Sequence, residues 1–369
     1  MLVSDKVLYL SISNASQGLG IYEQEKKANA EEDTKSSHAW LNLYAKDSEP
    51  VSNLPFKIIG QKWLESIRYK VKESTYARYN YVVFRYVFPY IGTIPFVNLN
   101  ASIIDEYANQ LLAKGKIENS GGLSGKSVTD ILSIVKQIIK YAHIYIDNDN
   151  LHLDNLRIKQ TSKKMRVLSR CEERDLTKYL MANMDYMNFG ILLSLYSGIR
   201  LGELCALKWE NINEQTGILE IRKTILRIQN TEPYAVSKTK VIISSPKSQC
   251  SMRDIPLPES ILQIVRKIKA SPTSYILSGL PQKYVEPRTM QNYFQRVLIE
   301  AQVSHANFHA LRHTFATRCV ELGFEIKSLS EILGHSNVNI TLNRYVHSSL
   351  EQKQENMNKI DHFFNLSAI

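Results

Sequence analysis

The amino-acid sequence predicts a mostly α-helical protein with a small antiparallel β-sheet, arranged as a helical domain followed by a mixed α+β domain. Three observations support this fold class. Apolar residues recur at helical spacing over residues 53–146 and again from residue 168, a stretch beginning at Ile218 alternates like a strand, and the basic stretch 147–167 is typical of a linker. The length of 369 residues is sufficient for two such domains.

The first domain, residues 53–146, should contain four helices. Phe56, Ile59 and Trp63 mark the apolar face of the first helix. Ser74 is a candidate N-cap for the second, which Pro89 and Gly92 should end, in part because proline has no backbone N–H to donate. The expected helices cover residues 56–67, 74–88, 99–112 and 127–144.

The second domain, residues 168–347, should begin with a capped helix, because Ser169 and Glu172 match a capping box. A second, apolar helix follows, and Ser197-Gly198 interrupts it, which places Arg200 at the entry of the next helix. Helices are expected again from Glu259 onward.

A strand region separates these helices. Ile218–Ile225 alternates between apolar and polar residues and predicts one strand. Lys240–Ser244 and Met252–Leu257 predict two more, joined as a hairpin by a turn that contains Pro246 and Lys247.

Charge and composition favour a polyanionic partner. The net charge is +10, and because residues 1–50 hold five Lys or Arg against eight Asp or Glu, the rest of the chain carries +13. Such an excess favours nucleic acid, although many basic proteins bind none. The four cysteines show no CxxC pair, which predicts reduced thiols. No apolar run reaches the roughly 20 residues of a membrane span, and no signal peptide is recognisable, so a cytoplasmic protein without membrane contact is expected.

Five residues suggest chemistry on a phosphodiester. Arg200 lies in an apolar neighbourhood, His309 and Arg312 share a helix face, His335 follows a glycine at a helix end, and Tyr345 lies ten residues further on. Guanidinium groups can hold non-bridging phosphate oxygens while a tyrosine attacks phosphorus. Taken singly, each motif also has a structural explanation, such as an ion pair of Arg200 with Glu203 or Glu210. No carboxylate cluster accompanies them, so no metal or other cofactor is expected.

Together these motifs resemble the tyrosine recombinase (phage integrase) family over roughly residues 53–350. The matching segments are SGIRLGEL at 197–204, PKSQCSMRDIPL at 246–257, HALRHTFAT at 309–317 and LGHSNVNITLNRYVH at 333–347. The resemblance implies a helical core-binding domain followed by a catalytic domain of the tyrosine recombinase type.

The resemblance also implies a role for each site residue. Tyr345 would attack the scissile phosphate and form a 3′-phosphotyrosyl bond, while Arg200 and Arg312 hold the non-bridging oxygens. His309 and His335 would hydrogen-bond the phosphate, and one of them could accept the tyrosine proton. Lys247 would act as general acid, with Lys238 and Lys240 as nearby alternatives, and Glu203 would brace Arg200 from behind. Neither metal nor ATP is implied.

The resemblance implies double-stranded DNA as partner and a homo-tetramer working through a Holliday junction, with accessory DNA-bending or excision factors as further partners and a nucleoid-associated location. Residues 1–52 are expected to be flexible or to bind arm DNA. Residues 348–369 are expected to form a C-terminal helix or tail exchanged between subunits. The predicted DNA contacts are Arg68, Lys70, Lys72, Arg78, Arg85, Lys163 and Lys164.

The function implied is integration and excision of a mobile element, such as a phage or an integrative and conjugative element. A chromosome-dimer-resolving recombinase and a type IB topoisomerase share this chemistry and are the alternatives. A DNA-binding regulator without catalysis is the alternative from another class.

Overall fold

The computed structural model describes residues 53–116, 120–146, 151, 158–160, 165–232, 234–246, 249–345 and 357–358. The chain divides into two units, Met1–Thr161 and Ser162–Ile369, and each is described by itself. The segment 1–52, Lys163, Lys164, Lys247 and most of the tail 348–369 lie outside the described residues, as does part of the linker 147–167.

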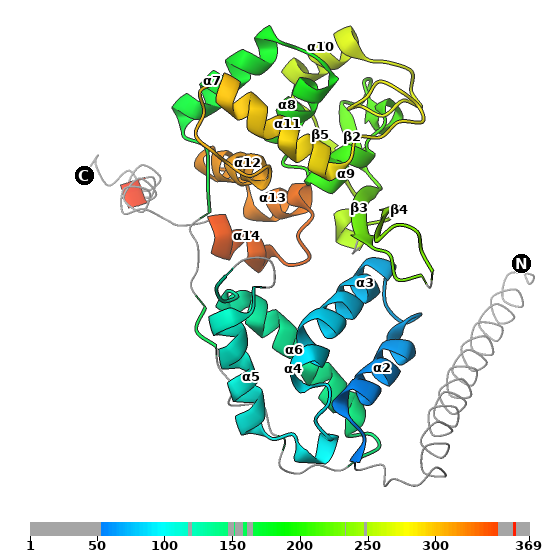
Figure 1. Ribbon diagram of the computed structural model, residues 1–369. Helices are drawn as coiled ribbons and strands as arrows, with labels where there is room; N and C mark the ends of the chain where they lie inside the picture. Colours follow the sequence, from blue (N-terminus) through cyan, green and yellow to red (C-terminus); the bar gives the residue numbers. More distant parts are fainter. Residues whose placement is uncertain are drawn as a thin grey trace, which may run out of the picture. The chain divides into compact units, whose positions relative to one another are not determined.

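The first unit is a bundle of helices, drawn from blue to green in Figure 1. The helices are α2 (Phe56–Ile67), α3 (Glu73–Val82), the π-helical turn η2 (Val83–Val87), α4 (Phe88–Ile91), the 3₁₀ turn η3 (Phe96–Asn98), α5 (Ala101–Lys114) and α6 (Gly125–Ala142). The four predicted helices are therefore present, with ends shifted by a few residues.

The second helix differs from its prediction at both ends. It begins at Glu73, and Lys72 rather than Ser74 occupies the N-cap position, where its side chain makes no capping hydrogen bond. At its other end the chain passes through the π-helical turn and continues into α4, with Pro89 in the first turn of α4. The wider turn accommodates a residue that cannot donate a backbone hydrogen bond, so the helix passes Pro89 and ends at Ile91, with Gly92, the other predicted stop, as its C-cap.

Apolar faces of these helices meet in one core. Helix α6 contributes a continuous buried stripe that includes Val128, Val135 and Ile138, and Phe56 and Val83 pack against the same core. Polar caps support the ends: the side chains of Asn100 and Ser124 accept hydrogen bonds from the first turns of α5 and α6. Burial of this stripe, rather than helix propensity alone, is what stabilises the bundle.

The second unit begins with the predicted capping box. Ser169 accepts from the backbone of Glu172 while the Glu172 side chain accepts from the backbone of Ser169. The helices are α7 (Arg170–Ala182), α8 (Tyr186–Ser197), α9 (Leu201–Ala206), the 3₁₀ turn η4 (Trp209–Asn211), α10 (Glu259–Ile268), α11 (Pro287–Glu300), α12 (His309–Glu321), α13 (Ile326–Leu333) and α14 (Val338–Tyr345).

Two small antiparallel sheets lie between α9 and α10. Strands β1 (Ile212–Asn213), β2 (Ile218–Ile221) and β5 (Arg253–Pro256) form one sheet in the order β1-β2-β5. Strands β3 (Thr224–Gln229) and β4 (Thr239–Ser244) form the other, beside α9.

This topology corrects two predictions. The stretch Ile218–Ile225 is not one strand, because the chain leaves the first sheet at Arg222 and enters the second at Thr224. The strands on either side of Lys247 are also not a hairpin: β4 pairs with β3, and β5 pairs with β2. The polar run Arg222-Lys223-Thr224 lies at the break, but a strand pattern does not show which partner the residues on either side pair with.

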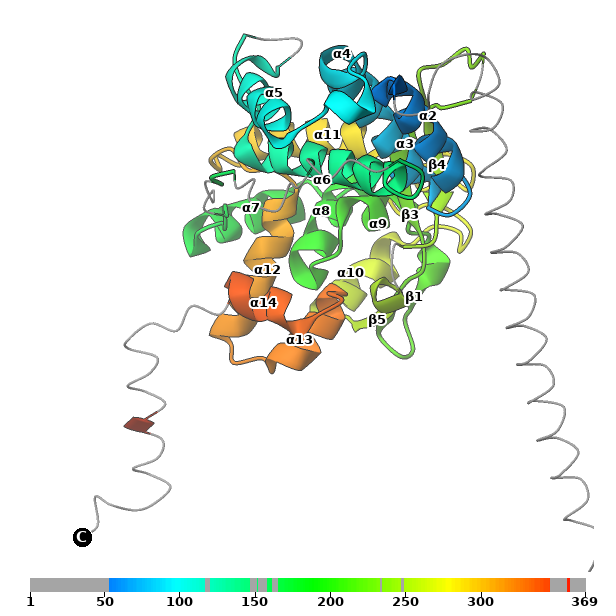
Figure 2. The same cartoon turned by 90° about the horizontal axis from the view of Figure 1, so that it is seen from below.

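The last three helices form a subsidiary core. Ala316 and Cys319 of α12, Leu329 and Leu333 of α13 and Tyr345 of α14 are buried together, apart from the larger core of the unit. Helices α12, α13 and α14 lie side by side in both views (Figures 1 and 2). Among the described residues, no helix is long and apolar enough to span a membrane.

Candidate active site

A left-handed turn after α8 positions Arg200. Gly198 ends α8 with φ +64°, and a Cβ at this position would lie 2.5 Å from Phe315 Cδ1, so both backbone conformation and space favour glycine. The chain then turns so that Arg200 becomes the N-cap of α9, with about a third of its side chain exposed. Its guanidinium donates to Glu203 Oε1 at 2.8 Å and to the carbonyl of Gly334 at 2.9 Å.

Arg312 lies in the second turn of α12 and is 2% exposed. It donates to the carbonyl of Gly198 at 2.8 Å and to that of Leu333 at 2.6 Å. Burial, and next the charge of Arg200, lower the pKa of Arg312 to about 9, so the guanidinium remains charged at neutral pH. Among the described residues no carboxylate forms an ion pair with Arg312, and a buried cation of this kind gains from an arriving anion.

Glu203 and Arg253 form a buried ion pair behind these arginines. Arg253 Nη1 donates to Glu203 Oε1 at 3.1 Å and Nη2 donates to Oε2 at 2.9 Å. Burial alone would raise the pKa of Glu203, but the hydrogen bonds and charge of Arg253, with the charge of Arg200, outweigh it and lower the pKa below its usual value. Glu203 is therefore an anion that supports two guanidinium groups at once.

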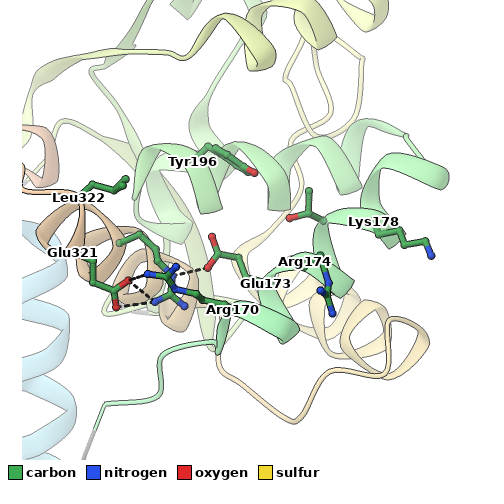
Figure 3. Close-up of a pocket in the computed structure, with 9 residues that line it drawn as sticks. Arg170, Glu173, Arg174, Lys178, Tyr196, Glu321 and Leu322 are labelled. Atoms are coloured by element: carbon green, nitrogen blue, oxygen red, sulfur yellow. Dashed lines mark hydrogen bonds and ion pairs between the residues drawn. The ribbon is translucent and has the colours of Figure 1, made fainter.

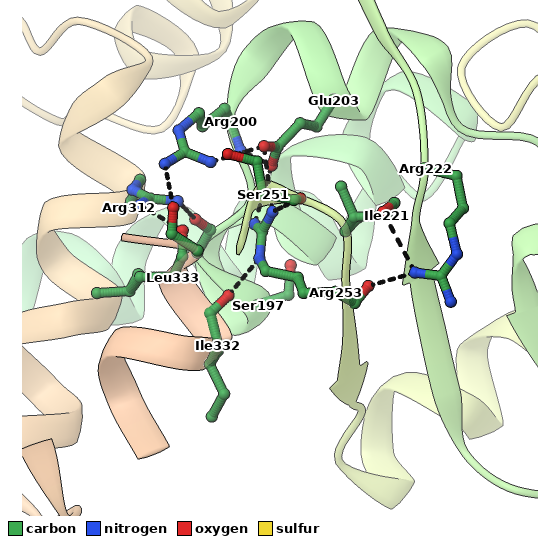
Figure 4. Close-up of polar contacts among 12 residues, drawn as sticks. Ser197, Arg200, Glu203, Ile221, Arg222, Ser251, Arg253, Arg312, Ile332 and Leu333 are labelled. Atoms are coloured by element: carbon green, nitrogen blue, oxygen red, sulfur yellow. Dashed lines mark hydrogen bonds and ion pairs between the residues drawn. The ribbon is translucent and has the colours of Figure 1, made fainter. Parts of the chain in front are cut away.

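Three arginines from distant segments cap the end of α13. Arg253 Nε donates to the carbonyl of Ile332 at 2.5 Å, Arg312 to that of Leu333 and Arg200 to that of Gly334 (Figure 4). These consecutive carbonyls lie at the negative end of the helix dipole, where cations are stabilised. The guanidinium groups are thus held close together before any ligand binds.

Gly334 makes this cap possible and leads directly to His335. Its φ is +64°, and a Cβ would lie 3.0 Å from Arg253 Cδ. His335 then places Nδ1 2.8 Å from Thr341 Oγ1, and its ring is parallel to that of Tyr345, with centroids 6.5 Å apart and planes 4° apart. Burial, followed by the charges of Arg312 and Arg200, lowers the pKa of His335 to about 3, so the ring is neutral at pH 7.

Tyr345 is the last residue of α14 and is 6% exposed. Its hydroxyl lies 2.8 Å from Nδ1 of His313. Burial raises the pKa of Tyr345 above its usual value near 10, although the charges and hydrogen bonds of Arg312 and Arg344 oppose the rise. The resting side chain is therefore a neutral phenol beside two cations.

His309 begins α12 and packs edge-on against His313, with ring centroids 4.5 Å apart. Desolvation of the ring, and next the charge of Arg312, lower the pKa of His309 to about 4, even though the residue keeps an exposed surface. It is neutral at pH 7 and remains accessible from solvent.

The structure brings most of the predicted site residues into one region of the second unit. Arg200 and Arg312 bind adjacent carbonyls, His335 stacks on Tyr345, His309 lies near Arg312, and Glu203 pairs with Arg200. The predicted Lys247 is outside the described residues, so its position relative to this group stays a prediction.

Three further residues contribute that the sequence reasoning did not select: Arg253, His313 and Arg344. His313 carried a signal, because it lies four residues after His309 and such residues share a helix face. Arg344 precedes the tyrosine directly. Arg253 pairs with a carboxylate fifty positions away, and only the fold reveals that contact.

The predicted DNA contacts in the first unit lie in the turn between α2 and α3, in α3 and in the π-helical turn η2. Lys70, Lys72 and Arg85 are exposed, whereas the guanidinium of Arg68 lies over the rings of Tyr69 and Tyr76. Arg78 donates to Asp130 at 3.1 Å, and the same carboxylate accepts from Lys126 at 2.9 Å. Part of the charge of Arg78 is therefore already balanced.

A pocket of about 740 Å³ opens elsewhere on the second unit, between α7, α8 and the end of α12 (Figure 3). On its rim Arg170 donates to Glu321, and Arg318 donates to both Glu173 and Glu321. Tyr196 and Leu322 supply apolar surface. None of the predicted catalytic residues lines it. Within the described part of the chain, no group of three or more His, Cys, Asp or Glu is arranged to hold a metal ion.

Comparisons with known proteins bear on the family and the fold of the chain. The model of the phage integrase family matches residues 155–352, and the model of the phage integrase N-terminal SAM-like domain matches residues 56–112. A "Tyrosine recombinase XerC-like" protein of Caldanaerobacter subterraneus subsp. tengcongensis is 27% identical over 338 residues, covering 82% of this chain and 81% of the relative.

Two solved structures share the fold. The Tn1549 transposon integrase in complex with a circular intermediate DNA superposes with a TM-score of 0.65 at 22% identity, covering 83% of this chain and 99% of that one. The lambda integrase tetramer bound to a Holliday junction superposes with a TM-score of 0.56 at 16% identity, covering 81% and 80%. Both agree with the predicted fold class, a helical core-binding domain followed by a mixed catalytic domain.

Proposed function

Because the chain belongs to the phage integrase family and is a tyrosine recombinase, we propose that it cuts and rejoins DNA strands through a 3′-phosphotyrosine bond formed by Tyr345. The observation that carries the proposal is the position of the Tyr345 hydroxyl, buried beside Arg312 and Arg344 within the unit that also holds Arg200. A phenol in that setting lies next to positive charges that can bind and stabilise a phosphodiester.

In the proposed reaction the scissile phosphate binds between Arg200 and Arg312. Both have guanidinium donors held in place by backbone carbonyls, so their positions need little reorganisation when the substrate arrives. Negative charge grows on the non-bridging oxygens in the pentacoordinate transition state, and two nearby cations stabilise that state more than the ground state.

Tyr345 then attacks phosphorus as the bond to the 5′-oxygen breaks. His309 and His335, both neutral at pH 7, are proposed to donate hydrogen bonds to the phosphate. Lys247 is proposed to protonate the leaving 5′-oxygen. The phosphotyrosyl bond retains the energy of the phosphodiester, so ligation to another strand needs no ATP, and the guanidinium groups supply the charge that a metal ion would otherwise provide.

We further propose that the partner is duplex DNA, that four copies act together through a Holliday junction, and that the role is integration and excision of a mobile element. The +13 charge of residues 51–369 supports DNA binding, and the likenesses to the Tn1549 and lambda integrases support the assembly and the role. Accessory DNA-bending or excision factors and exchange of residues 348–369 between subunits belong to the same proposal.

A second candidate is a chromosome-dimer-resolving recombinase, which the likeness to a XerC-like protein favours. The two roles differ in their substrate. A mobile-element integrase should join the two ends of the DNA that carries its own gene, whereas a chromosomal resolvase should act on a chromosomal site even when the gene is supplied from a plasmid. Sequencing the recombined junctions in cells that carry the gene separates them.

The test of the chemistry is a labelled duplex carrying the recombined junction, incubated with the protein and run on a denaturing gel. The wild-type chain should form a covalent adduct, and Tyr345→Phe should bind the duplex but form none. Tyr196→Phe, which alters an exposed tyrosine in the pocket that holds none of the predicted catalytic residues, is the matched control and should form adduct normally. Adduct formed by Tyr345→Phe would refute the assignment of the nucleophile.

Relaxation of a plasmid without the junction, at full rate by monomers, would instead favour a type IB topoisomerase.

A further inference from the structure

The hydroxyl of Tyr345 has a specific histidine as its partner. Nδ1 of His313 lies 2.8 Å from the phenolic oxygen, within hydrogen-bond distance, and both side chains are buried. A phenol with a raised pKa is a poor nucleophile unless a base accepts its proton during the attack. The identity of the proton acceptor is therefore a separate question from the identity of the nucleophile.

The two histidines first considered for this role are engaged differently. His335 directs Nδ1 to Thr341 Oγ1 at 2.8 Å, whereas the Tyr345 hydroxyl has its histidine hydrogen bond with His313. His309 packs edge-on against His313 and keeps an exposed surface, which suits contact with an incoming phosphate.

We propose that Nδ1 of His313 accepts the phenolic proton when Tyr345 attacks the scissile phosphate. This inference rests on the proposed function. In the step, the O–H bond of Tyr345 breaks and its proton forms an N–H bond on His313, while the phenolic oxygen forms a bond to phosphorus. The bond from phosphorus to the 5′-oxygen breaks, and that oxygen takes a proton from the general acid.

The charged groups around His313 make its pKa depend on whether DNA is bound. The charged or titratable neighbours are His309 and Arg312 from α12 and Arg344 and Tyr345 from α14. Helix α8, which packs on α12, contributes no charged side chain, and Lys327 and Glu331 of α13 are exposed.

In the resting protein, burial and then His309, Arg344 and Arg312 lower the pKa of His313 to about 4, which leaves Nδ1 free of a proton at pH 7 when Nε2 carries the hydrogen. A bound phosphodiester places negative charge beside Arg312 and offsets its repulsion of an imidazolium ion. The arrival of DNA thus favours protonation of His313 at the moment when a proton must be received.

Two substitutions separate proton transfer from hydrogen bonding. In His313→Asn, the amide oxygen can occupy the place of Nδ1 and accept a hydrogen bond, but it cannot take up a proton. In His313→Ala, neither function remains. His305→Asn changes an exposed histidine of the same unit and is the matched control.

The measurement is single-turnover adduct formation on the labelled junction duplex between pH 6 and 9, with binding of the duplex and thermal melting recorded for each variant. Loss of a general base costs about 10²–10⁴-fold in rate. Both His313 variants should lose that much at pH 7 while binding DNA normally. The wild-type and His305→Asn rates should vary little with pH, because neutral His313 is already in place. The variant rates should rise about tenfold per pH unit, because only the phenolate can then attack.

A wild-type rate and a flat pH profile in His313→Asn would overturn the proposal and leave His313 a positioning residue. Faster cleavage by His313→Ala would overturn it as well and would make the contact a restraint on Tyr345. In either case Tyr345→Phe would still form no adduct, so the proposed function would stand; adduct from Tyr345→Phe would remove both.

A measurement without DNA gives an independent outcome. Nitrogen NMR of ¹⁵N-histidine-labelled full-length protein at pH 7, with His313 assigned from its absence in His313→Asn, should show a neutral ring protonated at Nε2. A ring protonated at Nδ1 would mean that the histidine donates to the tyrosine, and the proposal would fail.

Discussion

Both oxygens of the Glu203 carboxylate accept hydrogen bonds from Arg253, fifty residues away in the chain and in a different element. Glu203 is in α9 and Arg253 begins β5, so this one contact joins the arginine-bearing turn after α8 to the first sheet. Arg253 continues to the carbonyl of Ile332 and thereby reaches α13. The side chains that hold the site are thus connected through one buried anion.

We predict that Glu203→Gln lowers the free energy of unfolding of the second unit by about 3–5 kcal/mol, because it leaves the buried Arg253 without its counter-ion. The reporter is the fluorescence of Trp209 during urea unfolding, in a background in which Trp40 and Trp63 are phenylalanine. Glu220→Gln, which alters an exposed carboxylate on β2, should change stability by less than about 0.5 kcal/mol. Equal effects of the two substitutions would contradict a structural role for the buried pair.

The same pair predicts a pH dependence. The pKa of Glu203 in the folded protein lies below its usual value of 4.5, so the unfolded chain takes up this proton first as the pH falls. The contribution of Glu203 to stability is therefore complete above about pH 5 and is lost as the pH falls through the folded-state pKa. Wild-type protein should lose stability more steeply than Glu203→Gln below pH 4.5, and parallel acid limbs of the two unfolding curves would count against the assignment.

Arg253→Lys should impair cleavage far more than DNA binding. A lysine cannot reproduce the planar fork that reaches Glu203, Ser251 and Ile332 together, so the end of α13 and His335 should shift. A misplacement of about 1 Å costs on the order of 10²-fold in rate, measured as single-turnover adduct formation. Arg222→Lys, at a half-exposed arginine that donates to the carbonyl of Arg253, provides the comparison and should retain most activity.

Gly198→Ala should destabilise the second unit more than Gly323→Ala. Both glycines have positive φ, so both substitutions incur a backbone cost of about 1–2 kcal/mol. Only at Gly198 would the new methyl group meet neighbours, at 2.5 Å from Phe315 and 3.0 Å from Leu333, whereas nothing lies within 4 Å at Gly323. Overpacking adds about 1–3 kcal/mol, and urea unfolding of the two variants should show that difference. The Gly198 variant should also lose adduct formation, because the Gly198 carbonyl orients Arg312.

Asp130→Asn should strengthen binding to duplex DNA. The substitution removes the carboxylate that pairs with Arg78 and Lys126 and makes both cations available to phosphate oxygens. The slope of log affinity against log salt should steepen by about one phosphate contact. Asp105→Asn, on exposed α5, changes the net charge equally and should have a smaller effect. Equal slopes in the two variants would remove this face from the DNA-binding surface.

Local chemistry explains which parts of the fold were predictable from sequence. The capping box at Ser169 and the stop at Gly198 depend on residues within a few positions of each other, and both are present. The helices followed from the spacing of buried side chains. The division of residues 218–229 between two sheets did not, because the pattern of a strand carries no information about which partner it pairs with.

The same distinction holds for the site. The motifs identified Arg200, Arg312, His335 and Tyr345, each within a recognisable local segment. Arg253 and His313 depend on how distant segments pack, the first through Glu203 and the second through the final turn of α14. A sequence pattern can select residue types for a reaction, but the residues that hold them in position, such as Arg253, are identified only from the structure.

The placement of Tyr345 within the same unit as Arg200, Arg312 and His313 has a consequence for mixtures of defective copies. In the proposed function one polypeptide furnishes both the attacking oxygen and the cations around it, so a copy lacking the tyrosine and a copy lacking an arginine should not complement each other. Co-expression of Tyr345→Phe with Arg312→Ala should leave cells as unable to recombine as either alone. On this proposal each protomer carries its own complete set of reactive groups, so assembly of several protomers is not what brings those groups together.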